Sequence, residues 1–282
     1  MEDGKLIPHI IHYCWFGGNP LPKSAVQCIE SWKKYCPGYE IREWNESNYD
    51  VHACPYVQEA YQAKKWAFVS DYARFDILYS YGGVYFDTDV ELIRPIDDIL
   101  LKGPFLGMEQ PDTEKACVYV APGLGMGAVA GHPIYHAILS EYKTKHFQND
   151  DGTYNQTTIV KYTTDTLREY GLSDAQHVQC VDGIWIYPWD YFCPMKYQTG
   201  ELAITSNTRS IHYYSATWLT KEEQAAHRLT IQASKQFGAG IGICIGRIYS
   251  FPHRVRMKVR QKGFWGAIQF AIQKVVSEIK GR

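Results

Sequence analysis

The sequence predicts an α/β fold in which short buried strands alternate with amphipathic helices. A first strand is expected within residues 7–18, where a short apolar run ends at a Gly-Gly pair. Helices are expected over residues 24–35 and 56–65, which repeat apolar residues at helical spacing, and the alternating residues 39–44 indicate a second strand. Strands and helices at these intervals favour a βαβ-type sheet, an architecture that suits nucleotide binding.

Residues 66–80 form the strongest helical pattern in the chain. Aromatic residues recur there at intervals of three and four, and Gly82 follows as a C-terminal stop. Asp71 and Arg74 lie three residues apart, so their side chains are neighbours on one face of this helix. They are either an exposed ion pair, worth ~0–1 kcal/mol, or groups that meet the Asp-x-Asp that follows.

That Asp-x-Asp consists of Asp87 and Asp89, within the stretch YGGVYFDTDVEL at residues 81–92. In an extended segment, residues i and i+2 face the same side, roughly 6–7 Å apart, so both carboxylates are expected on one face. Such a pair suits a hard divalent cation such as Mg²⁺, Mn²⁺ or Ca²⁺ rather than zinc. By itself the pattern is a weak signal, because solvated turns also carry it.

Composition and cysteine usage describe an ordinary soluble protein. Of its 282 residues, 45% are hydrophobic and 21% are charged. The eight cysteines include no Cys-x-x-Cys and no histidines at zinc spacing, so neither a zinc ribbon nor a redox motif is expected. The N-terminus has no basic region leading into an apolar run, and no 18-residue apolar run occurs. We therefore expect a cytoplasmic protein, with the inner face of the cell membrane as an alternative.

Charge divides the chain into an acidic body and a basic tail. Residues 221–282 contain twelve Lys/Arg and three Asp/Glu. Basic residues occupy every second position from Arg254 to Lys262, and residues 265–279 repeat apolar side chains at helical spacing. This tail is either an interfacial membrane anchor within 250–282 or a helix docked on the body. Nucleic-acid binding is not expected, because the acidic body would oppose it.

At three places the chain resembles glycosyltransferase family 32, the Asp-x-Asp sugar-transfer family of initiating mannosyltransferases and bacterial capsular polysaccharide synthesis proteins. The stretches are IPHIIHYCWFGG (7–18), SDYARFDILYSYGGVYFDTDVEL (70–92) and IHYYSATW (211–218). The second stretch is the most specific, and the core is also similar to that of glucosylating toxins. The resemblance implies a GT-A fold with a Rossmann-like, mixed sheet flanked by helices over residues 1–235, and a helical basic C-terminal appendage over 236–282.

The resemblance also implies roles for individual residues. Catalytic roles fall to Asp71, Arg74, Asp87 and Asp89, the last two as ligands of Mn²⁺ or Mg²⁺, with His212 as a further metal ligand. Trp15 resembles a residue that stacks on the nucleotide base, and Asp71 and Arg74 resemble groups that hold the donor's hydroxyls and diphosphate. The complete set of implied donor contacts is Trp15, Phe16, Asp71, Arg74, Tyr85 and Trp218.

The implied reaction is metal-dependent, retaining transfer of a hexose or N-acetylhexosamine from a nucleotide sugar to a glycan. A UDP-sugar donor and a role in capsule or surface polysaccharide synthesis are favoured, and a lipid-linked glycan is one candidate for the acceptor. Alternatives are a GDP-mannose-using mannosyltransferase, a toxin-like protein glycosyltransferase and a non-catalytic carbohydrate-binding protein. A haloacid dehalogenase-type phosphatase is disfavoured, because Glu91 stands where that motif has a small or β-branched residue and no later Gly-Asp-x-x-x-Asp occurs.

The middle of the chain carries less information. A strand is expected at residues 116–120 (ACVYV), and the glycine-rich residues 121–133 that follow it are interpreted as close backbone packing, with an acceptor-side loop as the alternative. Residues 154–167 lack the Gly-Pro-containing segment common in the family, so no acceptor residues are inferred.

Overall fold

The computed structural model divides the chain into two compact units. It describes residues 6–111, 117–215 and 219–280, and beyond residue 257 it describes the side-chain environment only at 259, 263 and 265. The first unit contains the residues up to Lys196 and a segment that begins at Leu202. The second contains residues 197–201 and those from Leu219 onward.

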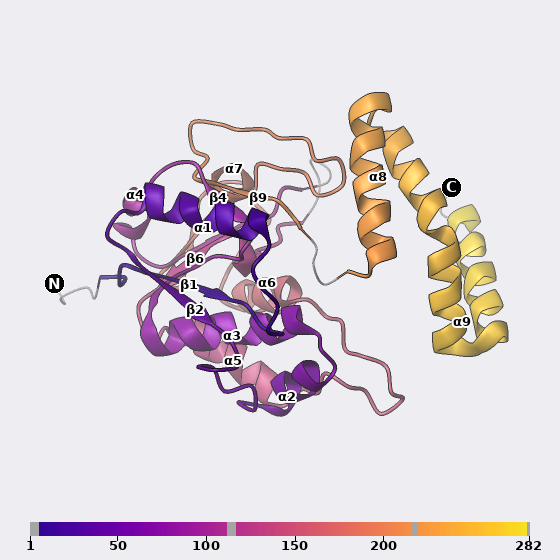
Figure 1. Ribbon diagram of the computed structural model, residues 1–282, viewed down its shortest axis with the longest axis horizontal. Helices are drawn as coiled ribbons and strands as arrows, with labels where there is room; N and C mark the ends of the chain where they lie inside the picture. The colour runs from indigo at the N-terminus through magenta and orange to yellow at the C-terminus, as the bar shows by residue number, and fades with distance from the viewer. Residues whose placement is uncertain (1–5, 112–116, 216–218, 281–282) are drawn as a thin grey trace. The chain divides into compact units, whose positions relative to one another are not determined.

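The first unit is built on a mixed seven-stranded sheet with the strand order β2-β1-β3-β6-β5-β8-β7, accompanied by a two-stranded β4-β9 sheet (Figure 1). β1 is parallel to β2 and β3, and β5 is parallel to β8. β6 is antiparallel to β3 and β5, and β7 to β8. The strands are β1 (Ile10–Cys14), β2 (Glu40–Trp44), β3 (Gly83–Tyr85), β4 (Val90–Leu92), β5 (Phe105–Gly107), β6 (Met126–Ala128), β7 (Gln179–Val181), β8 (Ile184–Tyr187) and β9 (Ser210–His212).

Helices pack on both faces of the large sheet (Figure 1). One buried cluster joins the sheet to α2, α3, α5 and α6, and the other joins it to α1, α4, α7 and β4. The helices of this unit are α1 (Lys23–Tyr35), α2 (Pro55–Gln62), α3 (Trp66–Tyr81), α4 (Asp97–Leu100), the 3-10 turn η1 (Pro122–Leu124), α5 (Pro133–Lys143), α6 (Ile159–Glu169) and α7 (Trp189–Phe192). The predicted α/β class, with a mixed sheet between helices, is confirmed.

Two details differ from the sequence-based expectations. Within 117–120, the described part of a strand expected next to the glycine-rich stretch, only Val120 forms an isolated bridge, because its N–H donates to Thr164 Oγ1 instead of a strand. Asp87 and Asp89 lie in a turn rather than an extended segment, and Val90 N donates to Asp87 O at 3.0 Å. The two carboxylates therefore converge through a change of chain direction, not through the pleat of a strand.

His12 fastens the centre of the sheet to the end of α3. Its fully buried ring accepts a hydrogen bond from Trp44 Nε1 at Nδ1 (3.0 Å), and its Nε2 lies 3.0 Å from Gly82 O. This pair of contacts fixes a neutral ring with the proton on Nε2. Burial lowers the pKa of His12 from its usual 6.5 to about 4.

The His12 pKa makes stability depend on pH. Below pH 6.5 the unfolded chain binds a proton at this histidine while the folded protein does not until about pH 4, so acid favours unfolding. Relative to a His12→Gln variant, we expect the wild type to lose about 2–3 kcal/mol of unfolding free energy between these pH values, measured by urea unfolding. A His52→Gln variant is the control, since His52 is exposed. Parallel pH profiles for wild type and His12→Gln would contradict the assignment.

The second unit is a pair of helices, α8 (Lys221–Phe237) and α9 (Ala239–Lys280). A capping box formed by Thr220 and Glu223 starts α8, and α9 bends at Gly263, whose φ is 69°. The helices pack closely: a Cβ at Gly242 would overlap Ser234, and one at Gly246 would overlap Thr230.

The helical C-terminal appendage is confirmed, and α8 belongs with it. The boundary expected from the sequence, between residues 235 and 236, lies near the end of α8, whereas α8 and α9 belong to one compact unit. The side chains that would make residues 265–279 amphipathic lie, apart from Trp265, outside the described residues. Among the described residues, no helix combines the length and the apolar character needed to cross a membrane.

Candidate active site

The candidate site forms where α3 passes through two glycines into β3 and then into the Asp87–Asp89 turn. Gly82 ends α3 with a φ of 66°. A Cβ at Gly83 would stand 2.7 Å from Ile10 O, so glycine is needed for β3 to lie against β1. The chain thus turns back along α3, and side chains from the turn after β3 and from the middle of α3 meet, Asp87 with Arg74.

Arg74 is the centre of the first group of side chains. Its guanidinium, with only 6% of the side chain exposed, lies 3.1 Å from Asp71 Oδ1 and 3.3 Å from Asp87 Oδ1. It also packs over the Tyr85 ring, with 5.0 Å between the guanidinium carbon and the ring centroid. Tyr85 itself is buried and donates its hydroxyl to Asp87 Oδ1 at 3.0 Å. A buried cation thus links one carboxylate of α3 to the first aspartate of the turn.

Burial and the neighbouring charges act in opposite directions on the pKa values of Asp71 and Arg74. Burial raises the pKa of Asp71 to about 6, against the attraction of Arg74. Burial also acts against the charged form of Arg74, but Asp87, Tyr85 and Asp71 outweigh it and hold its pKa above the usual value. The arginine is therefore a permanent positive charge, and Asp71 is a carboxylate with raised proton affinity.

The second group gathers around Asp89. The β4-β9 pairing places Val90 opposite His212, which brings His212 Nε2 to 3.1 Å from Asp89 Oδ1. The other carboxylate oxygen accepts hydrogen bonds from Ser215 N at 2.8 Å and Ser215 Oγ at 2.6 Å. Segments more than 120 residues apart in the sequence therefore share one carboxylate.

Asp87, Asp89 and His212 could hold a metal ion. One ligand atom from each lies within 4.8 Å of the others. His212 Nδ1 is buried without a hydrogen-bond partner in the described part of the chain, so this ring is only half satisfied by Asp89. Two carboxylates suit Mg²⁺ or Mn²⁺, and an added imidazole shifts the preference toward a transition metal such as Mn²⁺.

The pKa values at this trio show the pull of opposite charges. Burial alone would lower the pKa of His212, but the Asp89 carboxylate outweighs it and raises the pKa above 6.5. Burial alone would raise the pKa of Asp89, but His212 and the Ser215 hydrogen bonds hold it well below its usual range. Without a cation between them, the imidazolium and the carboxylate neutralise one another.

The residues predicted as base and donor contacts are distributed unevenly. Trp15 is half-buried and donates from Nε1 to Asn19 O at 2.6 Å. Phe16 packs against Tyr49 with only 5% of its surface exposed, which leaves little area for contact with a donor. Trp218 lies outside the described residues. The donor roles of these three residues stay predictions.

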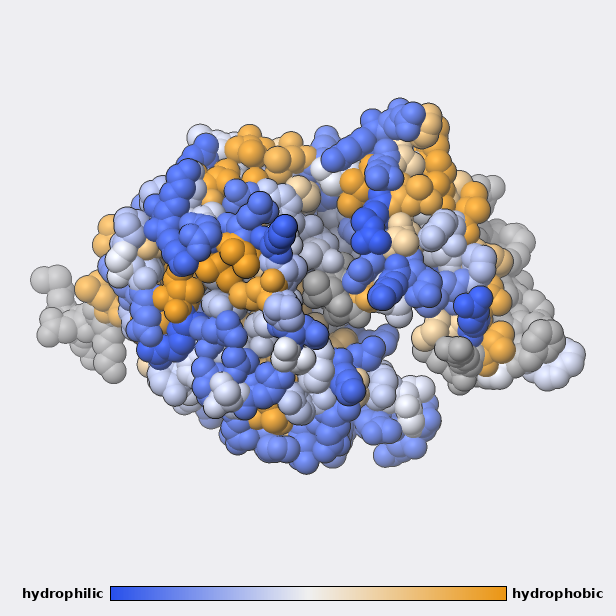
Figure 2. Space-filling view, in the orientation of Figure 1, coloured by the Kyte–Doolittle hydropathy of each residue, from blue (hydrophilic) through white to orange (hydrophobic). Residues whose placement is uncertain are grey.

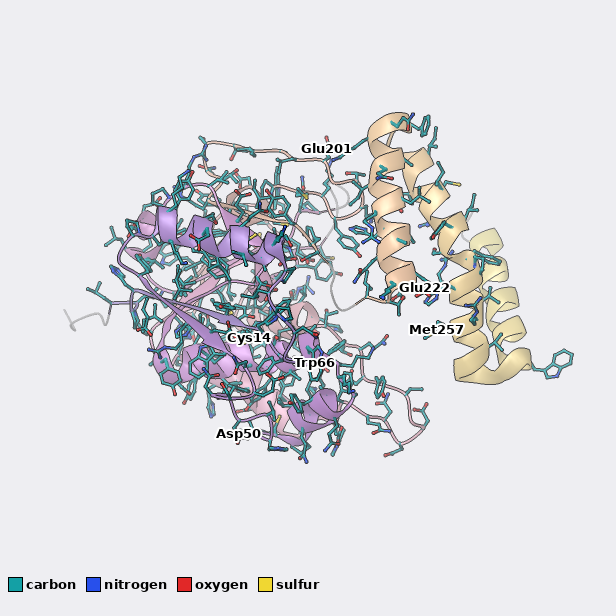
Figure 3. All side chains as sticks on the ribbon, in the orientation of Figure 1. Cys14, Asp50, Trp66, Glu201, Glu222 and Met257 are labelled. Carbon is teal, nitrogen blue, oxygen red and sulfur yellow. The ribbon has the colours of Figure 1, made fainter. Side chains whose placement is uncertain are left out.

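Three further residues were not identified from the sequence. Ser215 stands three positions after His212, a spacing that could have indicated a shared site. Trp66, at the start of α3 and labelled in Figure 3, lies against the backbone of Gly17, where a Cβ would be 2.6 Å from its Nε1. Gly123 of η1 has no sequence signal beyond its glycine-rich context, yet a Cβ there would overlap Asp87 Oδ2 and stand 3.0 Å from Arg74 Nη1.

Comparison with known proteins agrees with this arrangement. Residues 22–106, which include the Asp71, Arg74, Asp87 and Asp89 positions, match the protein family described as "Glycosyltransferase sugar-binding region containing DXD motif". The mixed sheet between helices and the gathered aspartates are the features that such a glycosyltransferase core would have. Over this segment the chain is similar to glycosyltransferases whose sugar-binding region contains a DXD motif, and the resemblance found in the sequence is confirmed.

Relatives of known or assigned activity share part of the chain. An uncharacterized glycosyltransferase L373 of Acanthamoeba polyphaga mimivirus is 24% identical over 67% of this chain and 78% of its own length. Inositol phosphoceramide mannosyltransferase 1 of Schizosaccharomyces pombe is 29% identical over 50% of this chain and 45% of its own. Mannosyl phosphorylinositol ceramide synthase CSH1 of Saccharomyces cerevisiae is 26% identical over 49% and 36%. The matched region thus spans less than half of each yeast protein.

Two solved structures show a distant likeness. The PaToxG glycosyltransferase is 15% identical, with a TM-score of 0.41, over 58% of this chain and 70% of its own. A glycosyltransferase involved in glycosylation of the major capsid of PBCV-1 is 14% identical, with a TM-score of 0.41, over 78% and 98%.

The position of Gly123 yields a prediction. In Gly123→Ala, the new methyl group displaces the Asp87 carboxylate from Tyr85 and Arg74, so Mn²⁺ affinity measured by electron paramagnetic resonance should fall at least about tenfold. Gly127→Ala is the matched control: its Cβ would meet Phe105 Cε1 at 2.5 Å, costing ~1–3 kcal/mol of stability without touching Asp87. Equal Mn²⁺ affinity in the two variants would contradict a positioning role for Gly123.

Proposed function

We propose that this protein transfers a hexose or N-acetylhexosamine from a nucleotide sugar to a glycan in a metal-dependent, retaining reaction. The observation that carries the proposal is the convergence of Asp71 and Arg74 with the Asp87, Asp89 and His212 trio. Arg74 pairs with two carboxylates, Asp71 and Asp87, and His212 pairs with the third, Asp89, so three carboxylates meet two cationic groups and the site keeps a net negative charge that a divalent cation would neutralise. An ordinary ion pair on the protein surface would not explain why Arg74 is buried. It would also not explain why His212 Nδ1 is buried without a hydrogen-bond partner among the described residues.

The chemistry explains why these groups stand together. Breaking a sugar–phosphate bond leaves negative charge on the nucleoside diphosphate, and a bound divalent ion supplies electrostatic stabilisation of that charge. Asp87, Asp89 and His212 would hold the ion. Arg74 directs its guanidinium toward the same place and would donate hydrogen bonds to a phosphate or a sugar hydroxyl. Asp71 would accept a hydroxyl hydrogen bond and so orient the donor sugar.

Donor and acceptor are proposed at the level of class. UDP-sugars follow from the resemblance to capsular enzymes and toxins, whereas the names of the yeast relatives favour mannose, and hence GDP-mannose. Those names also support an acceptor carried on a lipid, and a lipid-linked glycan in capsule or surface polysaccharide synthesis fits that class. We propose a cytoplasmic site of action at the inner face of the cell membrane, with peripheral contact through residues 250–282.

Donor hydrolysis tests the proposal directly. A panel of UDP- and GDP-sugars is incubated with the protein, with and without Mn²⁺, and release of nucleoside diphosphate is measured. We expect Mn²⁺-dependent release from one donor, reduced at least about 100-fold in Asp87→Asn/Asp89→Asn.

The control replaces two exposed aspartates, Asp165→Asn/Asp174→Asn, and should retain wild-type activity. Some transferases turn over only with acceptor, so calorimetry of each donor with Mn²⁺ accompanies the assay. If the protein neither releases nucleoside diphosphate nor binds any donor in a metal-dependent way, the transferase proposal fails and a carbohydrate-binding protein takes its place.

The raised pKa of His212 predicts how metal affinity depends on pH. A metal ligand must be deprotonated, so protons compete with Mn²⁺ once the pH falls below the His212 pKa, which lies above 6.5. We expect Mn²⁺ affinity to fall by up to about tenfold per pH unit in this range. His212→Gln should bind Mn²⁺ more weakly but with a flatter profile, and His227→Gln, in the second unit, should match the wild type. A flat wild-type profile would remove His212 from the ligand set.

A further inference from the structure

An unpartnered apolar stripe runs along the first half of α9. It consists of Ile241, Cys244, Ile248, Phe251 and Val255, all exposed. The exposed fractions of the four large side chains are 54%, 68%, 60% and 43% in chain order. Spacings of three, four, three and four keep these side chains on one face of a helix with 3.6 residues per turn. Figure 2 shows hydrophobic residues gathered over α8 and α9, and Met257, labelled in Figure 3, is half-buried and lies by helical spacing on the face of α9 opposite the stripe.

The stripe faces away from the contact between the two helices. Gly242 and Gly246 are buried and lie against Ser234 and Thr230 of α8. At about 100° per residue, these glycines stand on the side of α9 opposite the stripe. The helix pair therefore satisfies its own packing through small residues, and the large apolar side chains take no part in it.

Arginines border the stripe along both edges. By helical spacing, Arg247 and Arg254 lie along one edge, where Arg254 Nη2 donates to Arg247 O at 2.9 Å, and Arg256 lies on the other. No acidic residue occurs between residues 239 and 277. An apolar strip flanked by guanidinium groups on long aliphatic stems is the arrangement of a helix that lies in a membrane interface.

We propose that this stripe binds the surface of an anionic lipid bilayer, with the apolar side chains among the acyl chains and the arginines at the headgroups. A second copy of this helix is the other occupant that a three-four spacing suits. Arginines along both edges would oppose one another across such a pair, whereas anionic headgroups complement them. The stripe begins at Ile241, upstream of the basic residues 254–262 and of the amphipathic pattern at 265–279. Vesicle binding is measured without sugar transfer, so its failure can be told apart from a failure of the proposed enzymatic function.

Vesicle co-sedimentation of the full chain tests the proposal. We expect the wild type to bind vesicles of phosphatidylcholine containing about 30% phosphatidylglycerol at least about tenfold more tightly than phosphatidylcholine alone. Ile241→Ser/Ile248→Ser/Phe251→Ser should lose at least about tenfold on the anionic vesicles. The matched control, Leu101→Ser/Ile204→Ser, removes exposed apolar side chains of the first unit and should bind as the wild type does. The proposal is overturned if the stripe variant binds anionic vesicles as tightly as the wild type does, or if the wild type does not bind them.

The charge contribution is measured in the same way. Arg247→Gln/Arg254→Gln/Arg256→Gln should lower affinity for anionic vesicles at least about tenfold and leave weak binding to phosphatidylcholine unchanged. The control Lys23→Gln/Lys34→Gln changes exposed charges of the first unit. An equal loss in both variants would replace the specific surface with general electrostatic attraction.

Cys244 reports on the stripe itself. With the other two exposed cysteines changed in Cys117→Ser/Cys180→Ser, an environment-sensitive fluorophore can be attached to Cys244, since the remaining cysteines are buried. Anionic vesicles should shift its emission to the blue, and a label on Cys180, in a chain with Cys244→Ser, should not respond. If the Cys244 label instead shifts with protein concentration alone, and the stripe variant turns a dimer into a monomer, the stripe is a self-association surface and the lipid proposal fails.

Discussion

The burial of Arg74 is the constraint on which the site depends. A guanidinium with 6% of its side chain exposed is costly unless carboxylates surround it, and Asp71 and Asp87 lie within 3.3 Å. Because one partner comes from α3 and the other from the turn after β3, the ion pairs hold helix and turn in register. The β4-β9 pairing places His212 beside Asp89 on the same turn, so Asp87 belongs both to the ion pairs that stabilise this region and to the group that could hold a cation.

Glycines supply the space that this arrangement requires. Gly83 lets β3 approach β1, and Gly123 leaves room for the Asp87 carboxylate beneath Arg74. Gly125 and Gly127 likewise leave room for the rings of Phe86 and Phe105, which a Cβ at either position would overlap. The glycine-rich stretch is therefore close backbone packing, as its composition indicated, but at Gly123 that packing reaches the charged groups of the site. Backbone that can approach so closely acts as a fixed wall of the site.

The second unit differs from the first in how its helices pack. Its helices meet through Gly242 and Gly246 and therefore use little apolar area on each other. The large apolar side chains of α9 remain exposed between arginines, which is unfavourable in water. The proposed lipid-linked glycan would be presented at a membrane surface. If α9 binds that surface as proposed, the first unit is held on the same membrane as its acceptor, which raises the local concentration of one at the other.

The sequence by itself determined the alternation of strands and helices and the end of α3 at Gly82, and its resemblance to a known family singled out Asp71, Arg74, Asp87, Asp89 and His212, whose roles stay predictions. These features are local, because periodicity, a glycine stop and a short motif are written in neighbouring residues. Only the tertiary structure decided that Asp87 and Asp89 converge through a turn, that Ser215 completes the shell of Asp89, and that Gly123 sits beneath Arg74. Each depends on the pairing of distant segments, β4 with β9 and η1 with the turn, which no local pattern in the sequence encodes.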